Sequence, residues 1–105
     1  MKKYQLYTTY EFNKDFSKLD SSLQRQIEKC LEQIEINPYI GKPLGYRFLR
    51  EKKVQKHRVY FLIYDEYVVV FVVAISSKKD QQKAIDKIRL LMPYYKEEIK
   101  KKLNL

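Results

Sequence analysis

The segment that best predicts the fold is HRVYFLIYDEYVVVFVVAI, residues 57–75. It contains two runs, His57–Tyr64 and Tyr67–Ile75, that are rich in valine, isoleucine and aromatic residues, which favour β-strands. Asp65-Glu66 lies between the runs and predicts a tight turn. Since the second run is too short to cross a bilayer as a helix, we predict two adjacent antiparallel strands in a buried sheet.

Two helices are predicted upstream of these strands, because apolar residues recur there at helical spacing. The first set is Phe12, Phe16 and Leu19, and the second is Leu23, Ile27, Leu31 and Ile34. Two capping-box pairs, Thr8 with Glu11 and Ser21 with Gln24, indicate where the helices begin. The break between the helices is short, which predicts an antiparallel helical hairpin.

The remaining segments supply two further strands and a terminal helix. Lys3–Tyr7 and Tyr46–Arg50 are expected to form strands, while a loop that contains both glycines occupies residues 38–45. The terminal helical region carries an apolar face, and Pro93 is expected to interrupt it.

These elements predict a single domain over residues 1–105, with a C-terminal helical extension that starts near residue 79 and runs to residue 105. Its fold class is α+β: an N-terminal strand and a helix hairpin pack on a curved antiparallel sheet, and an extended helix ends the chain. In this arrangement the helices bury one face of the sheet. We expect the other face to be free to bind a partner.

Composition narrows the functional classes. The chain has 22 Lys and Arg against 13 Asp and Glu, and the net charge of +9 favours a polyanionic partner such as nucleic acid or an acidic protein. It has one histidine and one cysteine, Cys30, which falls on an apolar helix face and is expected to be buried. We therefore exclude a paired-histidine ribonuclease and a histidine-rich metal site, and we expect neither a metal nor another cofactor. No signal peptide or membrane span is recognisable, so the cytoplasm is the expected location.

The densest positive charge outside the C-terminal tail lies around the first strands of the predicted meander. It comprises Arg47, Arg50, Lys52, Lys53, Lys56, His57 and Arg58, and only Glu51 opposes it in that stretch. One interpretation is a solvated rim that protects an edge strand from aggregation. The other is a site that stabilises the negative charge of a reacting phosphodiester, with the RNA 2′-hydroxyl as nucleophile and no metal required.

Three motifs resemble the RelE/ParE superfamily of toxins, in the same order along most of the chain. They are the helical segment Phe12–Asp20, the helix exit Asn37–Leu44 and the strand His57–Tyr64. The resemblance implies a toxin of a toxin–antitoxin pair that cleaves mRNA on the ribosome, with an acidic cognate antitoxin as partner. It leaves as alternatives a noncatalytic toxin that inhibits DNA gyrase and, with less support, a plain nucleic-acid-binding module.

The resemblance also implies site residues. Arg58 stands where an arginine of the family contacts the scissile phosphate, and Lys53 and Lys78 stand at further basic positions. The predicted catalytic residues are therefore Lys53, Arg58 and Lys78. The other members of the dense positive stretch, together with Lys79 beside Lys78, are the predicted RNA-binding residues: Arg47, Arg50, Lys52, Lys56, His57 and Lys79.

The chain departs from the family at three positions. His57 stands where a tyrosine is usual, Glu51 stands where the nucleases are often basic, and Ala84 stands where some nucleases carry an aromatic residue. Two roles are open for Tyr94 and Tyr95: one of them supplies the missing ring to the site, or both pack the final helix against the sheet.

Overall fold

The predicted hairpin forms the centre of the sheet. In the computed structural model, which describes residues 3–105, β4 (His57–Tyr64) and β5 (Val69–Ser77) pair in antiparallel orientation from one end to the other. The connection is longer than the predicted two residues. It consists of a short 3-10 helix, η2 (Asp65–Tyr67), followed by Val68 in the left-handed region at φ 53°.

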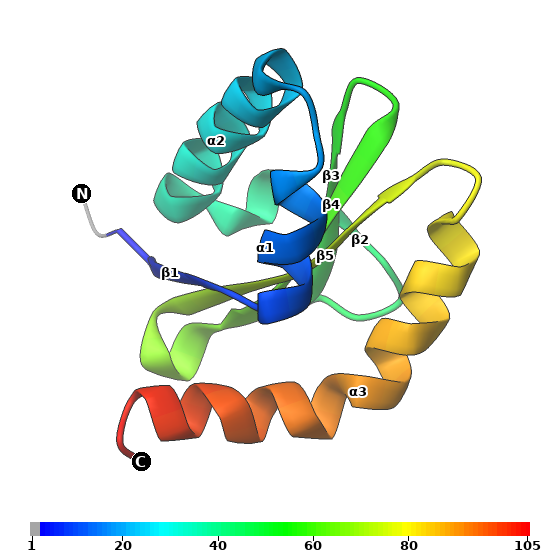
Figure 1. The fold of residues 1–105 in the computed structure, drawn as a ribbon. Coiled ribbons are helices and arrows are strands. Elements are labelled where there is room, and N and C mark those ends of the chain that lie inside the picture. Colours follow the sequence, from blue (N-terminus) through cyan, green and yellow to red (C-terminus); the bar gives the residue numbers. More distant parts are fainter. Residues whose placement is uncertain (1–2) are drawn as a thin grey trace.

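The sheet has five strands in the order β1-β5-β4-β3-β2 (Figure 1). β1 (Gln5–Thr8) lies parallel to β5, while β2 (Lys42–Pro43), β3 (Leu49–Val54) and β4 pair in antiparallel orientation. The third strand was predicted over Tyr46–Arg50 and in fact begins three residues later. Its sequence, LREKKV, has apolar residues only at its two ends and carries no strand pattern of its own. The strand is therefore recognised by its pairing with β4.

Both helices of the hairpin form, but the N-cap of each lies one residue away from the predicted cap. The side chain of Thr9 accepts a hydrogen bond from the amide of Phe12 at the start of α1 (Tyr10–Ser17), because Thr8 is still part of β1. The carboxylate of Asp20 accepts from the amide of Leu23 at the start of α2 (Ser21–Ile36). The helix exit continues into a second short 3-10 helix, η1 (Pro38–Ile40).

The second face of the sheet is covered, which corrects the expectation that it is free. One hydrophobic core lies between α1, α2 and one face of the sheet, and it includes Cys30 as expected. The other face carries the alternate residues of β4, Tyr60, Leu62 and Tyr64, and α3 (Gln81–Lys102) packs on them. Strand alternation places these apolar side chains on the far face, and they require a cover of their own.

α3 runs continuously through Pro93, which corrects the prediction of an interruption. A proline inside a helix removes one backbone hydrogen bond and bends the axis. Figure 1 shows the helix turning near its middle so that its two halves follow the curved sheet. The second half packs through Tyr95, which is buried edge-on against Phe71 at a ring-centroid distance of 5.9 Å.

No helix in residues 3–105 combines the length and apolar character needed to cross a membrane.

Candidate functional site

Strand alternation decides which of the predicted cations meet. Along β3, Leu49 lies in the core beneath α3, so Glu51 and Lys53 follow on the same face. Along β4, Arg58 shares the face of Tyr60 and pairs directly with Lys53 across the two strands. Lys53 and Arg58 are therefore neighbours on the face that α3 covers.

These cations line a cleft of about 360 Å³ between the β3–β4 hairpin and the loop after β5. We call it the cationic cleft, and its lining residues are Lys53, Gln55, Lys56, Arg58, Ser77, Lys78 and Lys79. Within the described chain, neither a carboxylate nor an aromatic side chain belongs to this lining. The four lysines are exposed, whereas Arg58 is only 8% exposed.

Arg58 is held in the wall of this cleft with few polar contacts. Its Nε lies 3.8 Å from Oε2 of Glu51, which is an ion-pair distance but too long for a hydrogen bond. Nε and Nη1 are both buried, and neither has a hydrogen-bond partner among residues 3–105. Buried donors are normally satisfied, so this guanidinium has hydrogen-bonding capacity that residues 3–105 do not use.

Polar groups behind Arg58 are better satisfied. Nε2 of Gln81 donates to both carboxylate oxygens of Glu51, at 2.7 and 3.2 Å. Tyr60 is fully buried, its hydroxyl lies 2.8 Å from Oγ of Ser76, and burial raises its pKa. A set of hydrogen-bonded polar groups therefore lies next to Arg58, whereas the lysine side chains that line the cleft are exposed to solvent.

Arg47 and Arg50 lie in a different place, around the ring of Tyr39. Their guanidinium carbons are 4.4 and 4.9 Å from the ring centroid, respectively. Arg50 also donates to the backbone carbonyls of Arg47, Tyr39 and Gly41, at 2.9, 3.2 and 2.7 Å. We call Tyr39, Arg47, Arg50 and Asp65 the Tyr39 cluster.

Asp65 closes this cluster from the β4–β5 turn. Its carboxylate accepts hydrogen bonds from the hydroxyls of Tyr39 and Tyr4, and Nη1 of Arg47 lies 3.6 Å away. Those two hydrogen bonds, followed by the charge of Arg47, hold the pKa of Asp65 below its usual value. The same contacts tie together four segments that are distant in sequence.

The structure thus brings together five of the nine predicted site residues, Lys53, Lys56, Arg58, Lys78 and Lys79. Lys52 points to the opposite face, where it lines a groove with Cys30 of α2. His57 is half-buried at the start of β4 with Nδ1 unpartnered, and it is not among the cleft-lining residues. Gln55, Ser77 and Gln81 were not among the predicted site residues, since no pattern in the sequence marks an isolated polar residue that reaches the site only through folding.

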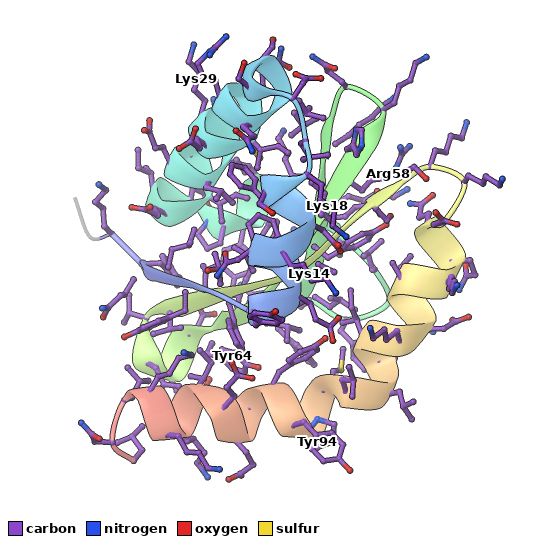
Figure 2. The ribbon with its side chains drawn as sticks, viewed as in Figure 1. Lys14, Lys18, Lys29, Arg58, Tyr64 and Tyr94 are labelled. Atoms are coloured by element: carbon purple, nitrogen blue, oxygen red, sulfur yellow. The ribbon has the colours of Figure 1, made fainter. Side chains whose placement is uncertain are left out.

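The tyrosines of the terminal helix do not reach the cleft. Tyr95 is buried in the core under α3, and Tyr94 is 70% exposed. Figure 2 shows Tyr94 on the far half of α3, well away from Arg58 at the hairpin end of the sheet. Ala84, which the family resemblance aligns with an aromatic residue of some nucleases, packs against the core beneath α3.

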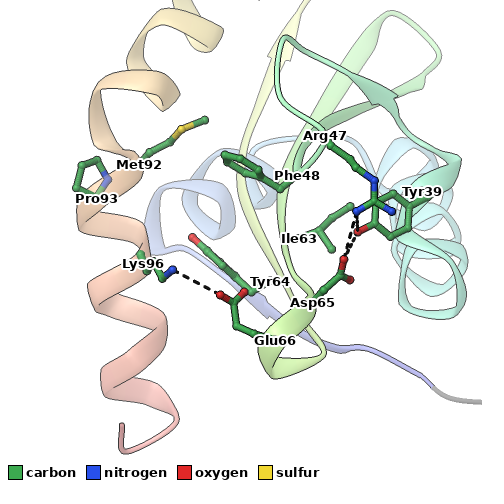
Figure 3. Close-up of a pocket in the computed structure, with 10 residues that line it drawn as sticks. All are labelled: Tyr39, Arg47, Phe48, Ile63, Tyr64, Asp65, Glu66, Met92, Pro93 and Lys96. Atoms are coloured by element: carbon green, nitrogen blue, oxygen red, sulfur yellow. Dashed lines mark hydrogen bonds and ion pairs between the residues drawn. The ribbon is translucent and has the colours of Figure 1, made fainter.

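A larger pocket of about 540 Å³ lies between α3 and the β4–β5 turn (Figure 3). Its floor is apolar and includes Phe48, Ile63 and Met92. The charged side chains at its rim are already paired, since Arg47 contacts Asp65 and Nζ of Lys96 lies 3.5 Å from Oε2 of Glu66. This pocket therefore offers less to a polyanion than the smaller cationic cleft. Nowhere in residues 3–105 do three or more His, Cys, Asp or Glu side chains gather as metal ligands.

Comparison with known sequences identifies one family. The sequence model of the ParE toxin of type II toxin–antitoxin systems, parDE, matches residues 2–82. No curated protein matches the chain at a significant level.

Solved structures with a similar fold include toxins and toxin–antitoxin complexes. The intact RelBE toxin–antitoxin complex of E. coli contains a chain with 28% identity and a TM-score of 0.65, and the match covers 70% of this chain and 95% of that one. A double mutant of E. coli RelE in the free state has 25% identity and a TM-score of 0.68, with 82% and 98% covered. The YoeB/ParE toxin of Agrobacterium tumefaciens, at 14% identity and a TM-score of 0.60, shares the fold over 70% of this chain and 96% of its own.

Proposed function

We propose that this chain, which belongs to the family of ParE toxins of type II toxin–antitoxin systems, cleaves mRNA on the ribosome, with the cationic cleft as its active site. It is a RelE-like toxin of a toxin–antitoxin system, and its fold is that of toxins that form complexes with an antitoxin.

One observation carries this proposal: a buried arginine with unused donors lies beside four exposed lysines. Nε and Nη1 of Arg58 lack hydrogen-bond partners in the described chain, and Lys53, Lys56, Lys78 and Lys79 line the same cleft. A phosphate group supplies the acceptors and the negative charge that such a set of donors lacks.

The chemistry follows from this set of charges. The 2′-oxygen of a ribose attacks the adjacent phosphorus, the bond to the 5′-oxygen of the next nucleotide breaks, and a 2′,3′-cyclic phosphate forms. Negative charge grows on the phosphoryl oxygens, where Arg58 stabilises it, and on the leaving oxygen, where Lys53 or Lys78 stabilises it. The proton of the 2′-hydroxyl leaves to solvent or a cleft amine, and the 5′-oxygen takes a proton in return.

The absence of an aromatic side chain from the cleft lining within residues 3–105 is consistent with a requirement for the ribosome. RNA sites that act alone commonly stack bases on aromatic rings. A cleft that holds only the backbone needs another surface to align the 2′-hydroxyl with the phosphorus.

Inhibition of DNA gyrase without catalysis is the second candidate. Two observations favour it: the matching family is described as the ParE toxin, and Glu51 offsets part of the charge of Arg58. A cationic cleft of this size also fits an acidic segment of a protein partner.

A reconstituted translation reaction tests the proposal. The purified chain is added, and the 5′ ends of the message are mapped beside a gyrase supercoiling assay. We expect new ends within translated codons, a strong loss of cleavage for Lys53→Gln and Lys78→Gln, and unchanged cleavage for the control Lys101→Gln, which removes the same charge at the exposed end of α3. An intact message with inhibited supercoiling would contradict the proposal.

A further inference from the structure

Two charged residues are buried within the described chain, and they face each other. Glu51 is 6% exposed and Arg58 is 8% exposed, and their side chains form an ion pair at 3.8 Å. Charged side chains are rarely buried without a partner, because leaving water is costly for an ion. The pair therefore explains how a guanidinium can stay in the cleft wall before any ligand arrives.

Gln81 holds the carboxylate of this pair from the first turn of α3. Its amide nitrogen donates to both oxygens of Glu51, at 2.7 and 3.2 Å. The contact links residues 30 positions apart in the sequence. Through it, β3 with Lys53, β4 with Arg58 and the helix that follows Lys78 and Lys79 are joined at one point.

Two hydrogen-bond donors of Arg58 remain unused by the described residues in this geometry. At 3.8 Å, Oε2 of Glu51 attracts Nε without forming a hydrogen bond, and Nη1 also has no partner in residues 3–105. The carboxylate already accepts from the amide of Gln81, so a closer approach to the guanidinium would disturb those hydrogen bonds. The arrangement therefore restrains Arg58 while keeping its donors available.

We propose that Glu51 and Gln81 are positioning residues that hold Arg58 in the wall of the cationic cleft. Glu51 supplies the counter-charge that keeps the guanidinium buried, and Gln81 fixes the orientation of Glu51. The kinetic consequence of this proposal rests on the proposed nuclease function, whereas its structural consequence does not. The carboxylate is then a support for the site and does not indicate that the site is inactive.

The structural consequence is tested by NMR on the intact chain labelled with ¹⁵N. We expect the wild-type chain to show a slowly exchanging Nε–H signal for Arg58, assigned by its loss in Arg58→Lys. Glu51→Gln and Gln81→Met, which keep the shape of each side chain, should broaden or remove that signal. Gln82→Met is the matched control, because the side chain of the neighbouring Gln82 donates to Asp86 on the exposed surface of α3.

Two NMR outcomes would overturn the proposal: no protected Arg58 signal in the wild-type chain, or an unchanged signal in both variants. Gln81 is half-buried, so Gln81→Met is expected to fold even if Glu51→Gln does not.

Cleavage kinetics separate this proposal from the proposed function. If the wild-type chain cleaves mRNA, Gln81→Met should lower kcat roughly tenfold to 100-fold with little change in KM, as expected for a displaced group that stabilises the transition state. Gln82→Met should be unaffected. If the wild-type chain cleaves nothing, the proposed function fails, and the NMR result alone decides whether Arg58 is positioned by Glu51 and Gln81.

Discussion

The cationic cleft and the Tyr39 cluster both contain cations near β3 and β4, but they differ in how far the hydrogen-bond donors of these cations are engaged. In the Tyr39 cluster, Arg50 donates three hydrogen bonds to backbone carbonyls and Arg47 contacts a ring and a carboxylate. In the cleft, two donors of Arg58 are buried without partners in residues 3–105. Cations whose donors are satisfied hold segments together, whereas cations with unused donors are placed to meet a ligand.

The difference is not visible in the sequence, where all of these residues belong to one run of positive charge. Tyr39 satisfies Arg47 and Arg50 only because η1 returns to lie beside β3. Substitutions in the cationic cleft and in the Tyr39 cluster are therefore expected to have different effects, although both groups belong to the same basic stretch of the sequence.

The largest expected effect is the loss of cleavage in Arg58→Ala. Removing a group that stabilises transition-state charge lowers kcat roughly 100- to 1,000-fold. Because Glu51 would then be a buried carboxylate without its counter-ion, we also expect a loss of about 3 kcal/mol in the free energy of unfolding. We therefore expect Arg58→Ala to destabilise the fold as well. Removing an exposed arginine that only contacts phosphate would leave the stability unchanged.

Arg58→Lys separates the two effects. A lysine keeps the charge beside Glu51 but lacks the planar fork that binds a phosphate through two donors. We expect near-native thermal unfolding with a strong loss of cleavage. Native cleavage in a folded Arg58→Lys variant would remove Arg58 from the reaction.

The second effect is the reverse pattern for Arg50→Ala. Three backbone carbonyls lose a charged donor, so we expect the free energy of unfolding to fall by about 1–3 kcal/mol. Cleavage per folded molecule should be unchanged, because Arg50 does not line the cleft. Urea unfolding monitored by circular dichroism gives the first quantity. A loss of cleavage without a loss of stability would show that the Tyr39 cluster also contacts RNA.

The sequence predicted the parts of the fold that local pattern determines. The β4–β5 hairpin and the helix pair were predicted because strongly apolar strands and helical stripes carry their own periodicity. β3 was misplaced because four of its six residues are charged, and only pairing with β4 marks it as a strand.

The candidate site was predicted less completely, for a related reason. Lys53, Arg58 and Lys78 were predicted from the family resemblance and line one cleft in the structure, but the face on which each side chain lies depends on strand register. That register places Lys52 and Lys53 on opposite faces of β3, and long-range packing places Arg47 and Arg50 at the ring of Tyr39, outside the cleft. Gln81 contacts Glu51 across 30 positions, and no local pattern could reveal that.

A third and smaller effect concerns the salt dependence of binding to single-stranded RNA. Each phosphate contact adds about 0.7 to the slope of log K against log salt concentration. Replacing both Lys53 and Lys78 by glutamine should therefore reduce the slope by about 1.4 if both contact phosphates. Arg47→Gln should leave the slope unchanged, because Arg47 is engaged by Tyr39 and Asp65. Fluorescence anisotropy at several salt concentrations measures both, and an equal effect of the two changes would remove the distinction between the regions.

The smallest expected effect is the pH dependence of stability that the Tyr39 cluster creates. The pKa of Asp65 is lowered in the folded chain, first by the hydrogen bond from Tyr39 and then by that from Tyr4. Stabilisation from this group is therefore present above the unfolded pKa of about 3.9 and is lost as pH falls through the lower folded value. Since the Asp65 side chain is 49% exposed, solvent screening limits the contribution to less than about 1 kcal/mol.

At the alkaline end, the hydrogen bond to Asp65 raises the pKa of Tyr4 to about 12. The unfolded chain loses its Tyr4 proton first, near pH 10, so this contribution to stability falls as pH rises from about 10 to 12. Asp65→Asn should flatten both limbs of a plot of unfolding free energy against pH, and Tyr4→Phe should flatten mainly the alkaline limb. Because Lys53 lies in the cationic cleft and not in the Tyr39 cluster, Lys53→Gln should leave both limbs unchanged. If Lys53→Gln altered the curve as much as Asp65→Asn, the two groups of cations would not differ in the way that their hydrogen bonds indicate.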